Sequence, residues 1–313
     1  MVTIKKIEIK DYFGRGNFEW NLDPVVNILG GKNGSGKSTL FKFCYILLTE
    51  QEIDDATDKK FSQLFQSAII TLSNGWILTW NSQNGFVDYG VRIGSNSTIY
   101  RVGATSLHDE EGNSHNLSDI TELTRILLIN SFEQQVEKAI QYEQKPKSLS
   151  LVDPTILDLM IQDQIDLRNR IFSATMEGFM DESVESIEGI NKYKKIHNKV
   201  YNSLSHFMKD YEKKITSNFD FTKDGENISW QNLSMGEKQI LLLLLTVSNT
   251  KQQPCIFFMD EPDLSMHIDW KEILVKELHE LNPNMQIILS THAPSVITGW
   301  MDRVEEVSHL IKK

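Results

Sequence analysis

The chain has 313 residues, of which 40% are hydrophobic, and a formal net charge of −11. This length and apolar content suffice for one large domain or two modest ones, which excludes a disordered protein. The acidic balance excludes a surface that is basic throughout, so a contact with nucleic acid would need a local basic patch.

The N-terminal residues, MVTIKKIEIK, alternate apolar and charged side chains, as a half-exposed strand does. They lack the apolar centre of a signal peptide. The longest apolar run, residues 240–247, is shorter than the roughly 18 residues that span a bilayer. Cys44 and Cys255 lie in apolar runs without zinc-ligand spacing, which favours buried thiols in a reducing compartment. We therefore expect a cytoplasmic protein with no membrane contact.

A glycine-rich loop follows the predicted buried strand at residues 25–29 and precedes a predicted helix at residues 37–50. Its spacing matches G-x-x-x-x-G-K-[ST], the phosphate-binding loop, whose backbone N–H groups and helix dipole face one anion. An ordinary strand-to-helix turn is the structural alternative. We expect Lys37 to reach the β- and γ-phosphates of ATP and Ser38 to ligate Mg²⁺. The predicted nucleotide-binding residues are Gly31, Asn33, Gly34, Ser35, Gly36, Lys37, Ser38 and Thr39.

Short β-rich runs separated by Asn-Gly pairs predict an antiparallel meander over residues 67–103. A polar loop is expected over residues 104–118, followed by a buried strand at residues 125–130. Helical periodicity then predicts a helical insertion over about residues 131–217. Its basic stretch at residues 191–199 could touch a phosphate backbone, although a solvated helix face is the favoured interpretation.

The sequence LSMGEKQ opens an apolar helix after a hairpin predicted at Asp224-Gly225. Ser234 and Glu237 satisfy the capping-box pattern, which offers a purely structural role. However, Gly236 is a poor helix former, and a serine with free N–H groups at a helix start also suits an anion. Capping therefore explains Ser234 but not Gly236.

Two carboxylates, Asp260 and Glu261, follow the predicted apolar strand at residues 255–259. They would lie at the carboxyl edge of a sheet, where ligands bind in α/β folds. We expect Asp260 to hold the Mg²⁺ shell and Glu261 to orient or deprotonate the attacking water, against the alternative of a turn with acidic caps. His292 follows the next strand, at residues 285–290, and at that edge it can hydrogen-bond a γ-phosphate.

In this order, the four motifs resemble those of the ABC-type ATPase superfamily: Walker A, the signature, Walker B with its glutamate, and the switch histidine. The resemblance implies an α/β P-loop core, with a mixed sheet, flanking helices and an antiparallel β subdomain, plus the helical insertion. It also implies a head-to-tail homodimer, in which Ser234 and Gly236 of one protomer close over ATP held by the other. Residues 263–267 stand where the family's D-loop runs, across the dimer interface. The expected parts are an N-terminal lobe at residues 1–130, an insertion at 131–217 and a C-terminal lobe at 218–313.

Spacing decides between branches of that superfamily. Lys37 and Ser234 lie much farther apart than in transporter subunits, and the helices are too short for the long coiled coils of chromosome-maintenance and recombination ATPases. The chain is most similar to compact ATPases of the overcoming-lysogenization-defect and Septu-like bacterial defence groups, without their TOPRIM nuclease.

This resemblance implies an ATPase that controls a separate effector protein, either a nuclease or a toxin. A DNA-repair ATPase and a nucleotide-locked scaffold with little turnover are the alternatives. Gln134 or Gln135 is the expected Q-loop glutamine and Mg²⁺ ligand. Arg15 either contacts the nucleotide or is an ordinary surface arginine.

Overall fold

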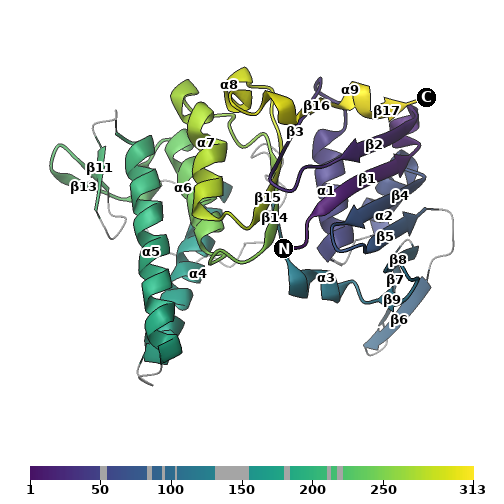
Figure 1. Ribbon diagram of the computed structural model, residues 1–313, viewed down its shortest axis with the longest axis horizontal. Coiled ribbons are helices and arrows are strands. Elements are labelled where there is room, and N and C mark those ends of the chain that lie inside the picture. The colour runs from purple at the N-terminus through teal and green to yellow at the C-terminus, as the bar shows by residue number, and fades with distance from the viewer. Residues whose placement is uncertain are drawn as a thin grey trace.

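A five-stranded parallel sheet forms the centre of the molecule (Figure 1). The computed structural model describes residues 1–49, 55–82, 87–93, 96–102, 104–130, 155–179, 184–209, 213–216 and 221–313. The strand order is β10 (Arg125–Ile129), β14 (Cys255–Asp260), β15 (Met285–Ser290), β3 (Val26–Gly30) and β16 (Val304–Glu306). The middle strands are buried on both faces, which is why they read as unbroken apolar runs.

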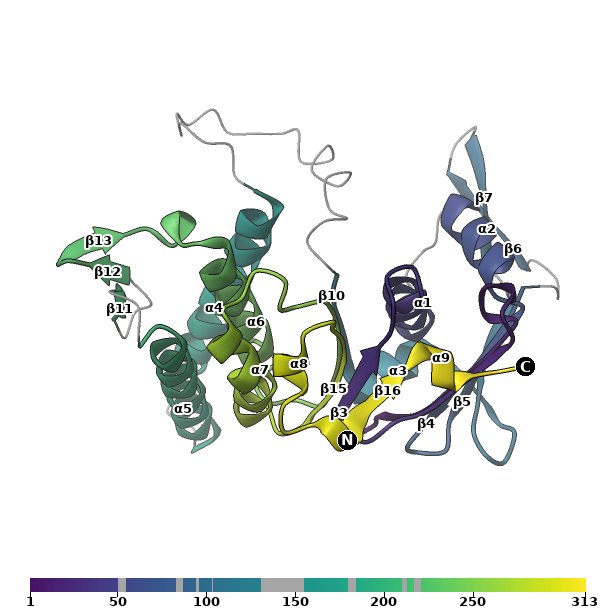
Figure 2. The ribbon, with the colours of Figure 1, turned by 90° about the horizontal axis from the view of Figure 1, so that it is seen from above.

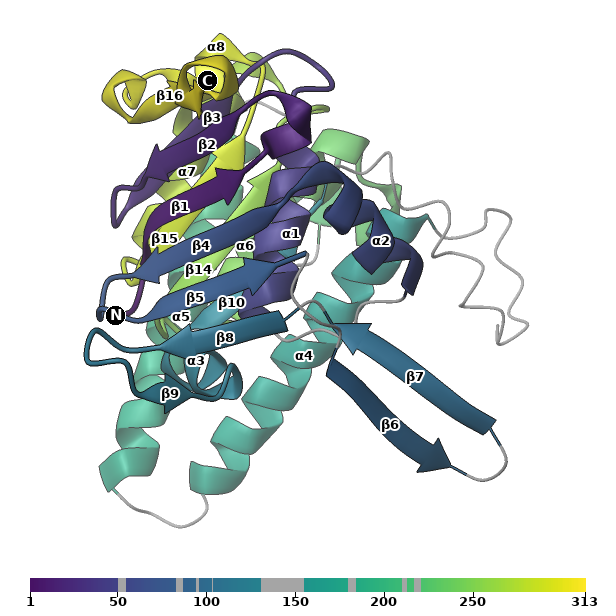
Figure 3. The ribbon, with the colours of Figure 1, turned by 90° about the vertical axis from the view of Figure 1, so that its right-hand side faces the viewer.

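An antiparallel seven-stranded sheet lies beside the first (Figure 3). Its order is β17 (Ile311–Lys312), β2 (Asn17–Asn21), β1 (Ile4–Lys10), β4 (Ser67–Leu72), β5 (Ile77–Asn81), β8 (Ala104–His108) and β9 (Ser114–His115). The predicted turn at residues 74–75 joins β4 to β5, with Gly75 at a φ of 87°. The predicted meander ends there, because β6 (Val87–Ile93) and β7 (Asn96–Val102) pair in a sheet of their own.

The prediction of a polar loop at residues 104–118 is wrong. β8 adds to the sheet alongside β5, and Leu107 is buried opposite Leu78. β9 then pairs with β8, and α3 (Ser118–Leu123) begins at the end of the segment. A short strand with one buried apolar residue has no periodic pattern to reveal it, so polarity alone misled the prediction.

Helix α1 (Lys37–Thr49) lies between the two sheets (Figure 2). Phe41 packs against Phe258 of the parallel sheet, with ring centroids 5.6 Å apart. Phe43 packs edge-on against Trp80 of the antiparallel sheet, with ring centroids 5.0 Å apart. One core therefore fills the space between the sheets and places the N-terminus of α1 beside the end of β3.

The opposite face of the parallel sheet is covered by α4 (Ile156–Phe179), α5 (Val184–Phe207), α6 (Met235–Ser248) and α7 (Ile268–Leu281) (Figure 2). Helix α6 is buried along almost its whole length, which accounts for its run of leucines. The predicted hairpin turn at residues 224–225 joins β12 (Phe221–Lys223) to β13 (Glu226–Ile228), and β12 also pairs with β11 (Lys213–Ile215).

Helices α4 and α5 fall within the predicted insertion, whose boundaries stay a prediction because residues 131–154 and 217–220 lie outside the described ranges. Among the described helices, none is both long and apolar enough to cross a membrane. The shorter elements are η1 (Tyr12–Gly14), α2 (Asp55–Leu64), η3 (Trp230–Asn232), α8 (Pro294–Ile297), η4 (Met301–Arg303) and α9 (Val307–Leu310).

Candidate functional site

The glycine-rich loop joins β3 to α1 and is packed on two sides. Gly31, Gly34 and Gly36 have φ angles of 141°, 74° and 102°, which other residues rarely adopt. A Cβ on Gly36 would lie 2.4 Å from the ring of Phe13 and 2.6 Å from the hydroxyl of Tyr12. Glycine is therefore required at position 36 by the η1 turn as well as by the backbone.

Lys37, the first residue of α1, points back over the loop. Its Nζ donates to the carbonyl oxygen of Gly31 at 2.8 Å and lies 3.1 Å from Nε2 of His292. Burial lowers the pKa of Lys37, while the nearby carboxylates of Glu261, Asp260 and Glu306 act in the opposite direction. The Lys37 ammonium is thus buried at the loop, where it can form a charge-assisted hydrogen bond to an anion.

The predicted carboxylate pair lies at the carboxyl end of β14. Asp260 is fully buried and its Oδ1 accepts a hydrogen bond from Ser290 Oγ at 2.6 Å. Glu261 has a φ of 48°, and its N–H donates to the carbonyl and the hydroxyl of Ser290 at 3.1 and 3.2 Å. A left-handed conformation is unfavourable for glutamate, and such residues cluster at functional sites. This turn directs Glu261 toward His292.

His292 connects the glutamate to the lysine. Its Nε2 lies 3.3 Å from Oε1 of Glu261 and 3.1 Å from Nζ of Lys37. Nε2 accepts from the ammonium when it carries no proton and donates to the carboxylate when it carries one, so the tautomer decides which of the two contacts is a hydrogen bond. The fold thus brings together the three predicted catalytic residues from α1, β14 and the end of β15, while their roles stay predictions.

The residues proposed for Mg²⁺ are hard oxygen donors, as this ion prefers. Ser38 stands in the first turn of α1, and Asp260 is close enough to Lys37 to influence its charge. A buried carboxylate and a hydroxyl in the first turn of the helix after the glycine-rich loop are oxygen donors of the kind that Mg²⁺ takes beside a nucleotide. Gln134 and Gln135, the candidates for a third ligand, lie outside the described residues.

A cavity of about 580 Å³ opens beside the loop. Residues 31–35 form one wall and residues 306–308 another, with Arg15 at its edge. The Arg15 guanidinium donates to the carbonyl oxygen of Gly34 at 3.4 Å and lies over the ring of Phe13. Arg15 therefore belongs to the loop's surroundings, while its contact with nucleotide stays a prediction.

The signature segment begins α6. Ser234 is its N-cap, and the predicted capping box forms: Ser234 N–H donates to Glu237 Oε2 at 2.6 Å, and Glu237 N–H donates to Ser234 Oγ at 3.4 Å. A Cβ on Gly236 would lie 2.4 Å from the carbonyl oxygen of Ser265. Close packing against residues 263–267, the expected D-loop, thus accounts for the glycine that capping left unexplained.

This geometry places the chain among known proteins. The family model described as "AAA domain, putative AbiEii toxin, Type IV TA system" matches residues 26–298. The chain belongs to this AAA-domain family. The matched range contains the phosphate loop, the signature, both carboxylates and His292.

Three further proteins are similar to this AAA-domain chain. Retron Vc95 probable ATPase of Vibrio cholerae serotype O1 biovar El Tor is 36% identical over 115 residues, covering 32% of this chain and 22% of that protein. Retron Ec83 probable ATPase of Escherichia coli is 24% identical over 181 residues, covering 50% of this chain and 32% of that protein. Both matches thus span less than half of the relative's length.

The crystal structure of an SMC head bound to the C-terminal winged-helix domain of ScpA has the same fold. Its TM-score is 0.53 at 15% identity, covering 94% of this chain and 91% of that one. The expected α/β P-loop fold with flanking helices is thereby confirmed, and it contains one parallel and one antiparallel sheet. The identity is low enough that this likeness speaks for the fold alone.

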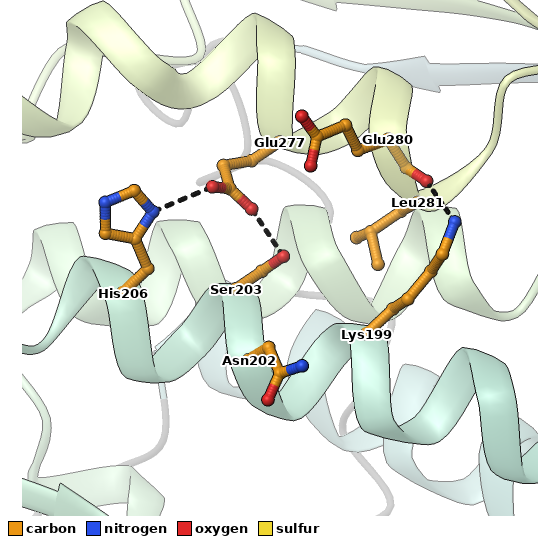
Figure 4. Close-up of a pocket in the computed structure, with 7 residues that line it drawn as sticks. All are labelled: Lys199, Asn202, Ser203, His206, Glu277, Glu280 and Leu281. Atoms are coloured by element: carbon orange, nitrogen blue, oxygen red, sulfur yellow. Dashed lines mark hydrogen bonds and ion pairs between the residues drawn. The ribbon is translucent and has the colours of Figure 1, made fainter.

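A second, smaller pocket lies between α5 and α7 (Figure 4). Glu277 of α7 lies between two α5 side chains: Ser203 Oγ donates to it at 2.5 Å, and His206 Nδ1 lies 2.8 Å from its other oxygen. Lys199 donates to the carbonyl oxygen of Glu280 at 2.7 Å. Each of these groups already has a partner. These polar contacts connect α5, in the predicted insertion, to α7, which follows the D-loop segment.

Proposed function

We propose that this chain binds Mg-ATP and hydrolyses it to ADP and phosphate. The observation that carries the proposal is the contact of Lys37 and Glu261 with the same nitrogen of His292, next to the phosphate loop. A cation, a carboxylate and an imidazole meeting at a helix N-terminus suit a triphosphate and the water that attacks it.

In this mechanism the phosphate loop holds the triphosphate by its N–H groups, and Lys37 exchanges its carbonyl partner for the β- and γ-phosphate oxygens. Ser38 and Asp260 would hold Mg²⁺, and the ion would supply positive charge beside the transferred phosphoryl group. Glu261 positions and deprotonates the attacking water. His292 hydrogen-bonds the γ-phosphate and keeps Glu261 oriented toward the site.

We further propose that two copies close around ATP. Three large apolar side chains are exposed around the signature and the D-loop: Met235 at 48%, Leu264 at 48% and Ile268 at 58%. Exposed apolar groups gathered beside a functional motif support a protein interface. In this dimer, Ser234 and the free N–H groups of the α6 N-terminus would meet the γ-phosphate held by the other copy.

Glu261→Gln tests both proposals together. We expect the variant to bind ATP, to release phosphate at least about 100 times more slowly, and to accumulate as a dimer in Mg-ATP. Light scattering after size exclusion gives the mass, and a phosphate assay gives the rate. Unchanged phosphate release would remove Glu261 from the mechanism, and negligible release by the parent itself would favour a nucleotide-locked scaffold. A monomer in saturating Mg-ATP would refute the dimer.

We propose that the dimer controls a separate effector in a bacterial defence system. The support comes from the AAA-domain family and from relatives named retron ATPases. Co-expression with the product of a neighbouring gene, followed by pull-down with and without ATP, tests it. Binding that requires ATP and is lost in Lys37→Met is the expected result, and binding independent of nucleotide would contradict nucleotide control.

DNA binding is the second candidate, and one feature of α5 favours it. Lys192, Lys194 and Lys195 are exposed, and within the described part of the chain none of them forms an ion pair. Clustered free lysines on an acidic protein form the kind of local patch that a phosphate backbone requires. Salt-dependent DNA binding that disappears on replacing all three with glutamine would support this candidate, and DNA binding that survives would exclude this patch.

A further inference from the structure

The signature helix carries a buried negative charge in its first turn. Glu237 lies in the first turn of α6 and is only 3% exposed. The N-terminus of a helix attracts anions, and a carboxylate there competes with any incoming phosphate. In the composite ATP site proposed above, an uncompensated Glu237 would repel the γ-phosphate that Ser234 is expected to meet.

Lys213 of β11 compensates this charge. Its Nζ donates to both carboxylate oxygens of Glu237, at 2.9 Å to Oε1 and 2.6 Å to Oε2. Oε2 also accepts the N–H of Ser234 at 2.6 Å. One unbroken series of hydrogen bonds therefore runs from Lys213 through Glu237 to the backbone of the signature serine.

The charge state of the pair agrees with this geometry. Burial raises the pKa of Glu237, but hydrogen bonds from Lys213 and from Ser234 outweigh it, and the pKa falls below its usual range. The glutamate thus stays ionised and paired at neutral pH. Because the ammonium offsets the carboxylate charge, the N-terminus of α6 keeps its attraction for another anion.

Lys213 comes from a different part of the chain than the signature. β11 follows α5, so the ammonium is supplied from the end of the helical insertion. The neighbouring signature residue is held in the same way: Lys238 Nζ lies 2.6 Å from Asp158 near the start of α4. Two elements of the predicted insertion, α4 and β11, are therefore tied to the first turn of α6.

We propose that Lys213 is a positioning residue of the composite ATP site, which neutralises Glu237 and thereby fixes Ser234 for the γ-phosphate of the other copy. The inference rests on the proposed dimer. It assigns a function to a lysine outside the four motifs and makes the insertion a structural part of the nucleotide site.

The test uses the full chain carrying Glu261→Gln, in which ATP-driven dimers accumulate. Lys213→Met is added to it, with Lys214→Met as the matched control, because Lys214 is exposed on the same strand. Dimer formation is followed by light scattering against ATP concentration, and monomer binding by a fluorescent ATP analogue. We expect Lys213→Met to raise the ATP concentration for half-maximal dimerisation roughly tenfold or more, and Lys214→Met to leave it within about twofold.

A second variant separates charge from folding. Lys213→Met/Glu237→Gln removes both charges and keeps an amide oxygen for the Ser234 N–H, so it should dimerise at markedly lower ATP than Lys213→Met alone. Lys213→Arg should also rescue, since a guanidinium can bind both oxygens.

Equal dimerisation of Lys213→Met and its parent would overturn the role of Lys213 while leaving the dimer intact. A double variant as defective as the single one would overturn the charge argument. Failure of the parent itself to dimerise would instead refute the proposed dimer and this inference with it.

Discussion

The Nζ atom of Lys37 lies 3.1 Å from Nε2 of His292, and this contact connects the start of α1 to the loop after β15. Lys37 is the charged side chain in the first turn of α1, and we propose that it contacts the triphosphate. Replacing it with methionine removes that charge. We expect ATP affinity to fall at least about 100-fold. Titration with a fluorescent ATP analogue measures it, and Lys42→Met, an exposed lysine on the same helix, is the control. Equal affinity in both variants would contradict the assignment of the loop.

His292→Ala is expected to separate binding from turnover. The side chain of His292 is 41% exposed, so its removal leaves the core intact. The rate of phosphate release should fall by roughly tenfold to a hundredfold, because Glu261 loses its orienting neighbour and the γ-phosphate loses a hydrogen bond. ATP affinity should change by less than about threefold. A variant with an unaltered rate would show that the imidazole is incidental.

Gly236→Ala tests the packing of the signature against the D-loop. The new methyl group would meet the Ser265 carbonyl oxygen at 2.4 Å, so one of the two segments must move. We expect a loss of about 1–3 kcal/mol in the free energy of unfolding and a loss of ATP-driven dimers. The matched control is Gly189→Ala in α5, where no atom lies within 4 Å and alanine should stabilise the helix by about 1 kcal/mol. Chemical denaturation measures both, and equal effects would argue against the close contact.

Asp158→Asn probes the tie between α4 and α6. Burial raises the pKa of Asp158, but hydrogen bonds from Lys238 and Thr155 outweigh it and hold the pKa below its usual value. A depressed pKa stabilises the folded state above the unfolded value of about 3.9, and the contribution disappears as pH falls through the folded pKa. We expect the variant to lose about 2–4 kcal/mol at pH 7 and to approach the parent at low pH.

Urea denaturation across pH measures the effect of Asp158. Asp163→Asn, on the exposed side of the same helix, serves as control and should change the free energy of unfolding by less than about 0.5 kcal/mol. A constant difference between Asp158→Asn and the parent down to acid pH would show that the ion pair is not the source of the stability.

Much of the site could be predicted because its residues follow unbroken apolar strands. Asp260 and His292 each come after such a run, and parallel strands bring their carboxyl ends to one edge. Ser290 ends the strand that precedes His292. Its hydrogen bond to Asp260 depends on the register between two strands, which a single sequence does not reveal.

The contacts that sequence reasoning missed are those between distant segments. Phe13, in the turn after β1, packs against Gly36, and no local pattern marks that approach. Lys213 fell within the predicted insertion and received no role there, because its partner Glu237 lies on another element of the fold. Likewise, the reason for a glycine at position 236 is its close approach to Ser265, which is distant in the sequence. All three contacts depend on which segments meet in the folded chain, and local secondary-structure propensity does not reveal them.

The position of α1 between the sheets has a consequence for how the protein loses its structure. Leu29, Phe258 and Ile288 of the parallel sheet share a core with Trp20 and Trp80 of the antiparallel one, and α1 is common to both. If one sheet unfolds, the inner face of the other sheet is therefore exposed to solvent. Heating should melt both together in a single calorimetric transition, and tryptophan emission from Trp20 and Trp80 should follow the same curve as the loss of helix.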